Sequence, residues 1–161
     1  MREGRLEDAA DMAYIFNHYV RTSDVIFSEQ ELGAAEMRRK LEPVVAGGFP
    51  FWVETDENDR VTGYCYAHLY HPDPVYHRTW ELTEYLDKDS VGRGTGTRLL
   101  ARTIEDCRSR GCHTVVAMIT AGNEACERMV RRAGLVLTGT IRDAGYKFGR
   151  YLDDAVYQRI L

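Results

Sequence analysis

The spacing of hydrophobic residues changes along the chain, and each change marks a change of predicted secondary structure. Residues 7–20 and 34–45 repeat apolar side chains every three to four positions, which is typical of helices with one buried face. After Gly47-Gly48 the spacing becomes that of short β-prone segments, and a helical repeat returns only after residue 90. The chain therefore begins with helices, continues with strands, and then mixes the two.

The remaining elements complete a mixed sheet. The predicted strands cover residues 51–54, 61–70, 79–86, 114–120, 135–141 and 155–160. One helix runs from the glycine-rich segment at residues 91–97 to about Gly111, and another is capped by Asn123 and closed by Gly134. This order predicts a mixed α/β fold with helices on both faces of the sheet, in one domain over residues 1–161.

Composition narrows the classes of function and partner. The chain has 161 residues, with 44 % hydrophobic and 29 % charged, which excludes disordered and collagen-like chains. No apolar run approaches the roughly 18 residues of a membrane span, and the acidic N-terminus does not resemble a signal peptide, so we expect a cytoplasmic protein. A pI near 5.7 argues against a nucleic-acid partner. The four cysteines match no zinc-ligand spacing, and we assign no metal.

Charge is divided unevenly along the chain. Residues 1–90 carry 9 Lys or Arg and 18 Asp or Glu, whereas residues 91–161 carry 12 and 7. The basic half begins with Val-Gly-Arg-Gly-Thr-Gly-Thr, between a predicted strand and a predicted helix. Glycines let the backbone approach a ligand closely, and a helix N-terminus attracts anions, so this loop is a candidate phosphate site. It lacks the lysine of a Walker A loop, and its third glycine comes one residue early for a dinucleotide fingerprint.

The loop resembles the acyl-CoA pyrophosphate loop of the GCN5-related N-acetyltransferases (GNAT), whose pattern is Gln/Arg-x-x-Gly-x-Gly/Ala. Gly94 and Gly96 match this pattern, and Val91 replaces the first residue. Other segments resemble the phosphinothricin and L-amino-acid N-acetyltransferase branch, in matching order over nearly the whole chain. These segments are Phe-Asn-His at 16–18, Ile-Phe-Ser-Glu at 26–29, Tyr-x-x-Thr-x-Glu at 76–81 and Gly-x-Lys-Phe-Gly-Arg-Tyr-x-Asp at 145–153.

The resemblance implies a GNAT fold, in which a mostly antiparallel sheet splits into a V between two parallel strands and acetyl-CoA enters the split as co-substrate. It also implies cofactor contacts. Backbone groups of Glu84, Tyr85 and Leu86 would bind the pantetheine arm. Asn123 would contact that arm, or serve only as a helix cap. The predicted pyrophosphate cradle consists of Gly92, Arg93, Gly94, Thr95, Gly96 and Thr97.

The implied reaction is direct attack of an amine on the acetyl thioester. Glu81 is the predicted general base, because burial among its apolar neighbours would raise its pKa. A backbone N–H near Tyr85 or Leu86 would stabilise the oxyanion. We expect a small-molecule amine as acceptor, an amino acid or an analogue such as phosphinothricin, and a homodimer. The predicted substrate contacts are Phe27, Tyr76, His77 and Arg78, with Tyr66 and Trp80 as further candidates for an aromatic pocket.

Three positions depart from the family pattern and leave other functions open. Val91 stands in the cofactor loop, and Val130 replaces a Tyr or His that could donate a proton. His77 replaces an arginine that is frequent in the substrate loop. These departures leave open a catalytically impaired acyl-CoA-binding or sensor protein. The acidic first half leaves open an N-acetyltransferase that acts on proteins or peptides.

Overall fold

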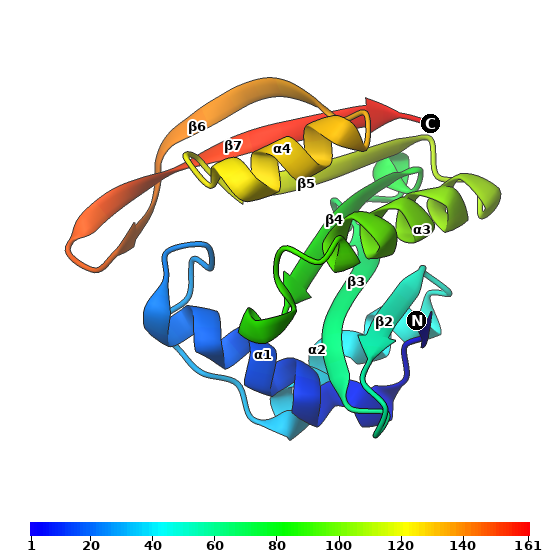
Figure 1. The fold of residues 1–161 in the computed structure, drawn as a ribbon. Helices are drawn as coiled ribbons and strands as arrows, with labels where there is room; N and C mark the ends of the chain where they lie inside the picture. The colour runs from blue at the N-terminus through cyan, green and yellow to red at the C-terminus, as the bar shows by residue number, and fades with distance from the viewer.

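A seven-stranded sheet in the order β1-β2-β3-β4-β5-β7-β6 forms the centre of the computed structural model, which describes residues 1–161 (Figure 1). All neighbouring strands are antiparallel except β4 and β5. The strands are β1 (Arg2–Glu3), β2 (Phe51–Thr55), β3 (Val61–Leu69), β4 (Thr79–Leu86), β5 (Thr114–Thr120), β6 (Val136–Lys147) and β7 (Arg150–Ile160). The helices are α1 (Ala9–Thr22), α2 (Ala34–Ala46), α3 (Thr95–Ser109) and α4 (Glu124–Arg132).

Helices cover both faces of the sheet, and each face has its own hydrophobic core (Figure 1). α1 and α2 pack over one face, against side chains such as Tyr64 and Tyr66 of β3. α3 and α4 pack over the other face, where alternate residues of β5 enter the core. Those residues are Val115, Ala117 and Ile119. The predicted mixed α/β fold with helices on both faces is confirmed.

The two parallel strands are paired only where they begin. Their ladder joins Thr79–Glu81 to Thr114–Val116, and no later residues of β4 and β5 pair. Beyond Glu81 the rest of β4 therefore runs along a split in the sheet. The predicted V-shaped split is confirmed, and Glu81 lies at its apex.

The last two strands differ most from prediction. Predicted to cover residues 135–141 and 155–160, they extend toward each other and form a long hairpin with a turn at Phe148 and Gly149. Both turn residues have positive φ, 51° and 76°, as the tight turns favoured in hairpins require. Most side chains of β6 are exposed, so the sequence shows no alternation of apolar and polar residues that would have predicted the longer strand.

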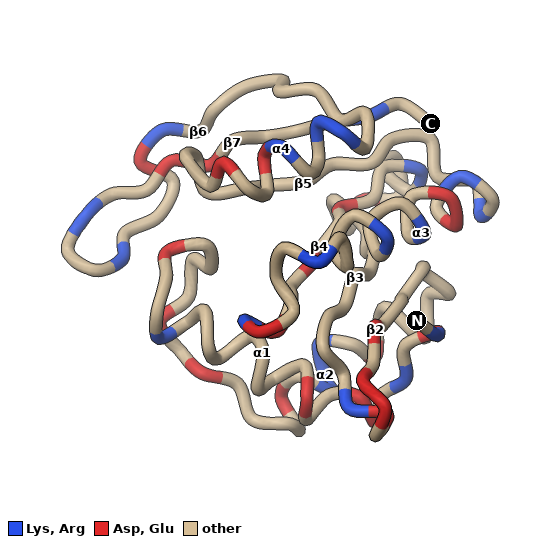
Figure 2. The backbone as a smooth tube through the Cα atoms, viewed as in Figure 1, with Lys and Arg blue, Asp and Glu red and all other residues tan.

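Basic residues of the second half of the chain are spread along α3, α4 and the β6–β7 hairpin (Figure 2), and the arginines of α3 and α4 are exposed. Arg128 and Arg131 of α4 form ion pairs with Glu124 and Glu127 one turn earlier. Much of the basic excess is therefore solvated helix surface, and only its first part belongs to the glycine-rich loop. None of the helices combines the length and apolar character that crossing a membrane requires.

Candidate active site

The backbone of β4 is shared between two neighbouring strands. The odd-numbered residues form their backbone hydrogen bonds with β3. For example, just after β4 the Asp87 N–H donates to the Thr62 carbonyl at 2.9 Å. Even-numbered residues face β5, as where the Arg78 carbonyl accepts from the Thr114 N–H at 3.1 Å. Because this alternation continues along an antiparallel strand, the split exposes the backbone groups of the even-numbered residues. These residues are Leu82, Glu84 and Leu86.

The predicted pantetheine contacts divide according to this alternation. Glu84 and Leu86 turn their backbone groups into the split, and the Leu86 carbonyl also accepts the Tyr19 hydroxyl at 2.8 Å. Tyr85 pairs with Tyr64 of β3, so its backbone groups are turned away from the split, contrary to the prediction. Its ring instead packs edge-on against Phe16 on the α1 face, with ring centroids 5.9 Å apart.

The glycine-rich loop leads into the N-terminus of α3. Gly92 and Gly94 have φ values of 81° and 74°, which residues with a Cβ rarely adopt. The first helical hydrogen bond runs from the Arg98 N–H to the Gly94 carbonyl at 3.1 Å. The helix therefore leaves three amides without an intrahelical acceptor. They are the amides of Thr95, Gly96 and Thr97.

Gly96 brings this helix start against the free edge of β4. A Cβ at Gly96 would lie 3.0 Å from Glu84 Oε1, 2.9 Å from Met129 Sδ and 3.3 Å from Leu86 Cδ1. A larger residue at this position would therefore push these side chains aside. Arg93 lies exposed in the same loop, and its carbonyl accepts from the Arg98 guanidinium at 3.2 Å.

This arrangement fits acetyl-CoA. Three free amides at the positive end of a helix dipole suit a pyrophosphate, and Arg93 adds positive charge beside them. The unpaired edge of β4 offers N–H and C=O groups to a ligand that carries amides, as the pantetheine arm does. The predicted cradle residues thus lie together, at the open end of the split.

Asn123 precedes α4 as its N-cap and Val130 lies on α4, which flanks the split on the side of β5. The Asn123 side chain accepts from the Cys126 N–H at 3.3 Å, so the predicted helix cap is confirmed. Contact between Asn123 and the cofactor arm stays a prediction. Val130 is 2 % exposed and packs in the core, where it offers no proton to a departing thiolate.

Glu81 lines a cavity of about 680 Å³ between α2 and the sheet. The walls are mostly apolar and aromatic, with a few polar groups among them, which is usual for a small-molecule site. From the sheet come Tyr64, Tyr66, His68, Leu69, Thr83 and Tyr85, and from α1, α2 and the following turn come Phe16, Met37, Lys40, Pro43, Val44, Gly47 and Phe49. The candidate base thus lies between the split on one side and a substrate-sized cavity on the other.

Three influences set the pKa of Glu81. Burial raises it above its ordinary value, because a carboxylate loses solvation in the cavity wall. His68 lies directly opposite on β3 and lowers it, whereas Asp154 of β7 raises it. Burial is the largest of the three, so the pKa of Glu81 is raised. A carboxylate so perturbed is a better proton acceptor than an exposed glutamate.

The predicted substrate contacts lie outside this cavity. The Phe27 ring packs against Gly145 of the hairpin, where a Cβ would come 2.6 Å from Phe27 Cδ2. His77 Nδ1 lies 2.8 Å from the Pro74 carbonyl. Tyr76 packs against His71 with ring centroids 4.8 Å apart.

Arg78 and Trp80 are also turned elsewhere. Arg78 Nε donates to the Gly111 carbonyl at 3.1 Å, near the end of α3. Trp80 is buried in the core on the α3 face. Of the predicted aromatic candidates, only Tyr66 lines the cavity. The loop before β4 folds back on itself through its prolines and Asp73, which caps a 3₁₀ turn, and this local geometry was not apparent from the motif.

Two polar residues of the cavity, Lys40 and His68, were not predicted. His68 could have been found by pairing β3 with β4, because the register places it opposite Glu81. Lys40 could have been found as a charged position within the apolar stripe of α2, between Met37 and Val44.

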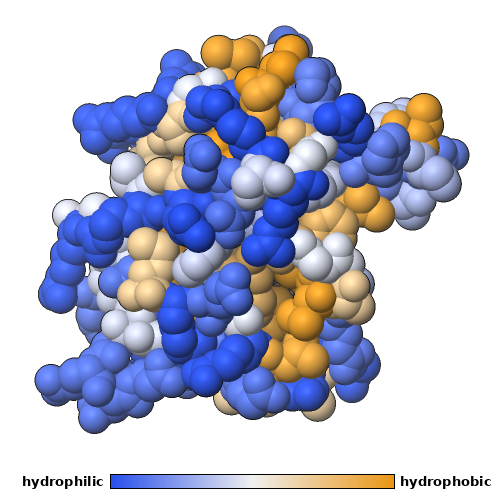
Figure 3. Space-filling view, turned by 90° about the vertical axis from the view of Figure 1, so that its right-hand side faces the viewer, coloured by the Kyte–Doolittle hydropathy of each residue, from blue (hydrophilic) through white to orange (hydrophobic).

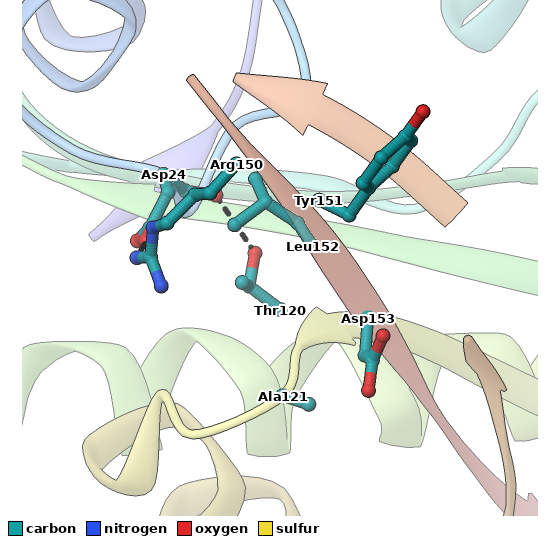
Figure 4. Close-up of a pocket in the computed structure, with 7 residues that line it drawn as sticks. All are labelled: Asp24, Thr120, Ala121, Arg150, Tyr151, Leu152 and Asp153. Carbon is teal, nitrogen blue, oxygen red and sulfur yellow. Dashed lines mark hydrogen bonds and ion pairs between the residues drawn. The ribbon is translucent and has the colours of Figure 1, made fainter. Parts of the chain in front are cut away.

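A smaller pocket of about 220 Å³ lies where the end of β5 meets the start of β7 (Figure 4). Asp24 and Arg150 form an ion pair there, and Thr120 Oγ1 donates to the Asp24 carbonyl at 2.9 Å. Neither Glu81 nor the glycine-rich loop contributes to its lining. We therefore locate the candidate active site at the split and the larger cavity. No cluster of His, Cys, Asp and Glu side chains is arranged to hold a metal ion.

Known proteins share this architecture. The family model described as an acetyltransferase (GNAT) domain matches residues 1–156. The chain is 33 % identical over 153 residues to an L-amino acid N-acyltransferase, MnaT, of Escherichia coli (strain K12), which covers 95 % of this chain and 88 % of that protein. A phosphinothricin acetyltransferase from Sinorhizobium meliloti, crystallised with acetyl-CoA, superposes with a TM-score of 0.95 at 28 % identity, over 99 % of this chain and 86 % of that one. A ribosomal-protein-alanine N-acetyltransferase from Brucella melitensis superposes with a TM-score of 0.94 at 32 % identity, over 99 % and 98 % of the two chains.

Proposed function

The chain belongs to the GNAT acetyltransferase family and is an acetyl-CoA-dependent N-acetyltransferase, and we propose that its acceptor is the amine of a free amino acid or amino-acid analogue. The observation that carries this proposal is the cavity that opens beside Glu81 at the apex of the split. Its volume of about 680 Å³ is in the range of small-molecule sites. The related L-amino acid N-acyltransferase and phosphinothricin acetyltransferase support the same class of acceptor.

We propose that the split holds acetyl-CoA through the free amides of α3 and the even-numbered backbone groups of β4. Bound acetyl-CoA supplies the thioester that the acceptor amine attacks. The residues that would contact the pyrophosphate are Gly92, Arg93, Gly94, Thr95, Gly96 and Thr97. Glu84 and Leu86 would meet the pantetheine arm, and one of their backbone N–H groups would donate to the oxyanion.

Glu81 is proposed as the general base. An acceptor amine enters largely as an ammonium, which cannot attack a carbonyl until it loses a proton. Glu81 lines the cavity and is the last residue of β4 that pairs with β5, so it lies where the acceptor space is next to the split. Its raised pKa makes it a stronger base than an ordinary glutamate.

A catalytically impaired acyl-CoA-binding protein is the second candidate, because Val130 offers no proton to the leaving thiolate. A thiolate is a fair leaving group without general-acid help, since thiols have a pKa of roughly 8.5. The decisive experiment measures thiol release from acetyl-CoA with a panel of free amino acids, glutamate analogues and simple amines. Turnover that Glu81→Gln abolishes, while acetyl-CoA binding persists, supports catalysis. Binding of acetyl-CoA without turnover of any amine supports the impaired protein.

A third candidate, acetylation of protein N-termini, is favoured by the ribosomal-protein-alanine N-acetyltransferase with which the chain superposes. The volume and the mostly apolar lining of the cavity beside Glu81 argue for a small acceptor instead. The same assay with alanine-starting and basic peptides separates the two. Peptide kcat/KM values well above those of every free amino acid would overturn our proposal.

We further propose that the protein forms a homodimer through the C-terminal strands. β6 is an edge strand of the sheet, and apolar side chains of β6 and β7 are exposed. Figure 3 shows hydrophobic atoms gathered at the top of that view, where the C-terminal strands lie. The exposed apolar residues are Val136, Leu137, Ile141, Tyr146, Tyr151 and Ile160. Light scattering tests this proposal, and a monomer at micromolar concentration would overturn it.

We propose a cytoplasmic location on the basis of the cysteines. All four cysteines are free thiols, as is usual in a reducing compartment. Fractionation of cells that express the full chain, followed by immunodetection, tests this location.

A further inference from the structure

Lys40 is an exposed charged residue of α2 at the edge of the cavity. It lies three residues after Met37 and four before Val44, which are 2 % exposed and belong to the core. Residues at this spacing share one face of a helix. Its side chain lines the same cavity as Glu81, and it is the only lysine or arginine that does so.

No acidic residue neutralises Lys40. Glu36, one turn earlier, would be its natural helical partner, but the Glu36 carboxylate accepts from the Gly33 N–H at 2.7 Å and caps the helix. The Lys40 ammonium lies over the Phe16 ring, 5.3 Å from its centroid. A cation held against an aromatic wall, with no ion pair, is available to an anionic ligand.

The cavity therefore carries opposite charges on opposite walls. Lys40 projects from α2, and Glu81 lies on the sheet that faces this helix. The family resemblance made His77 and Arg78 candidates for binding the acceptor's carboxylate, but neither residue lines the cavity. Arg78 instead donates to the Gly111 carbonyl. A molecule that carries both an ammonium and a carboxylate matches this distribution of charge.

We propose that Lys40 binds the carboxylate of the acceptor amino acid while the acceptor's amine faces Glu81. The inference rests on the proposed function and adds the residue that selects amino acids over plain amines. Lys40 is a specificity residue, which contacts neither the amine nor the thioester. Its loss weakens acceptor binding in ground state and transition state alike, which raises KM and leaves kcat almost unchanged.

The test compares L-methionine with L-methioninamide, which lacks only the charged carboxylate, in wild type, Lys40→Met and Lys40→Arg. Methionine suits the apolar walls of the cavity. We expect Lys40→Met to raise KM for L-methionine about 10- to 100-fold, the range for a lost charge-assisted hydrogen bond, with kcat within about twofold. KM for L-methioninamide should change little. Lys40→Arg should restore most of the preference for L-methionine.

Two further measurements show which carboxylate Lys40 binds and provide a matched control. L-isoglutamine keeps a carboxylate only at the end of its side chain, so a loss confined to this acceptor assigns Lys40 to a side-chain carboxylate. Arg39→Met removes the neighbouring exposed charge, which does not line the cavity, and should change neither KM. Calorimetric binding of N-acetyl-L-methionine to the CoA-bound protein gives a readout that does not require turnover.

The outcomes separate this inference from the proposed function. If wild type acetylates free amino acids but Lys40→Met loses equal activity on L-methionine and L-methioninamide, the inference alone is overturned. If wild type acetylates amines but no free amino acid, the proposed acceptor class is overturned and the inference with it. Thermal unfolding of each variant shows whether a loss reflects misfolding.

Discussion

His68 on β3 lies directly opposite Glu81 on β4 in the antiparallel register. The His68 ring has Nδ1 2.9 Å from the Leu69 carbonyl and Nε2 3.5 Å from Thr83 Oγ1. A positive charge on this ring lowers the pKa of Glu81, in opposition to burial, which raises it more. The strength of the proposed base therefore depends on a residue of the neighbouring strand.

The first prediction concerns the pH dependence of the reaction. Glu81 must be ionised to accept a proton, so kcat/KM should rise with pH through an apparent pKa above the ordinary glutamate value of 4.5. The measurement is kcat/KM for one acceptor between about pH 5 and 9, with correction for ionisation of the acceptor amine. An acid limb at the pKa of an ordinary glutamate would contradict the predicted perturbation.

Substitution of His68 should move that acid limb. His68→Gln removes a group that lowers the pKa of Glu81, so the limb should shift to higher pH. Activity at the acid end of the pH range should fall more than activity at the alkaline end. His113→Gln is the matched control, because His113 lies outside the cavity lining. A uniform loss at all pH values would point to a structural role for His68.

The glycine-rich loop can be tested apart from catalysis. Gly94 has a φ of 74° and precedes the free amides of α3, so Gly94→Ala should strain the loop by about 1–2 kcal/mol. We expect acetyl-CoA affinity to fall about tenfold or more, because the free N–H groups of α3 no longer point at the pyrophosphate. Titration calorimetry measures this change.

The control for this loop variant is Gly111→Ala. Gly111 has a φ of 86° and open space around its Cβ position, so it imposes similar strain at the opposite end of α3. Both variants should lose comparable stability, but only Gly94→Ala should lose affinity. Equal affinities for the two variants would remove the loop from the proposed cofactor site.

The sequence predicted the helices and strands whose apolar residues are regularly spaced or continuous. β4 and β5 begin and end where the apolar segments 79–86 and 114–120 predicted, because each segment packs in a core. Residues 142–147 and 150–154 were missed, since an exposed hairpin leaves no periodic burial to detect. The glycine-rich loop could be located because a tight turn before a helix requires glycine at positions with positive φ.

The acceptor side was predicted less well, and for a physical reason. A cavity depends on which side chains meet across elements far apart in sequence, such as Lys40 of α2 and Glu81 of β4. The motif that contains Glu81 drew attention to its sequence neighbours Tyr76, His77 and Arg78, whose side chains are engaged within their own loop or with the end of α3. Strand register, rather than proximity in sequence, identifies His68.

Glu84 leads to the last prediction, because its carboxyl group is buried without a partner. The residue as a whole is partly exposed along the split, but both carboxyl oxygens are buried and accept no hydrogen bond. Burial raises the pKa of Glu84 well above its ordinary value. A raised folded-state pKa means that stability is highest below the unfolded pKa and falls as pH rises toward the folded one.

Glu84→Leu should therefore stabilise the protein, by about 1–3 kcal/mol at neutral pH, the cost of an unpartnered buried polar group. Glu84→Gln should remove the loss of stability with rising pH while keeping the shape of the side chain. Urea unfolding at pH 5 and pH 8 measures both effects, with the exposed Glu105→Leu of α3 as control. A wild type as stable at pH 8 as at pH 5, relative to Glu84→Gln, would mean that the buried carboxyl has a partner in solution.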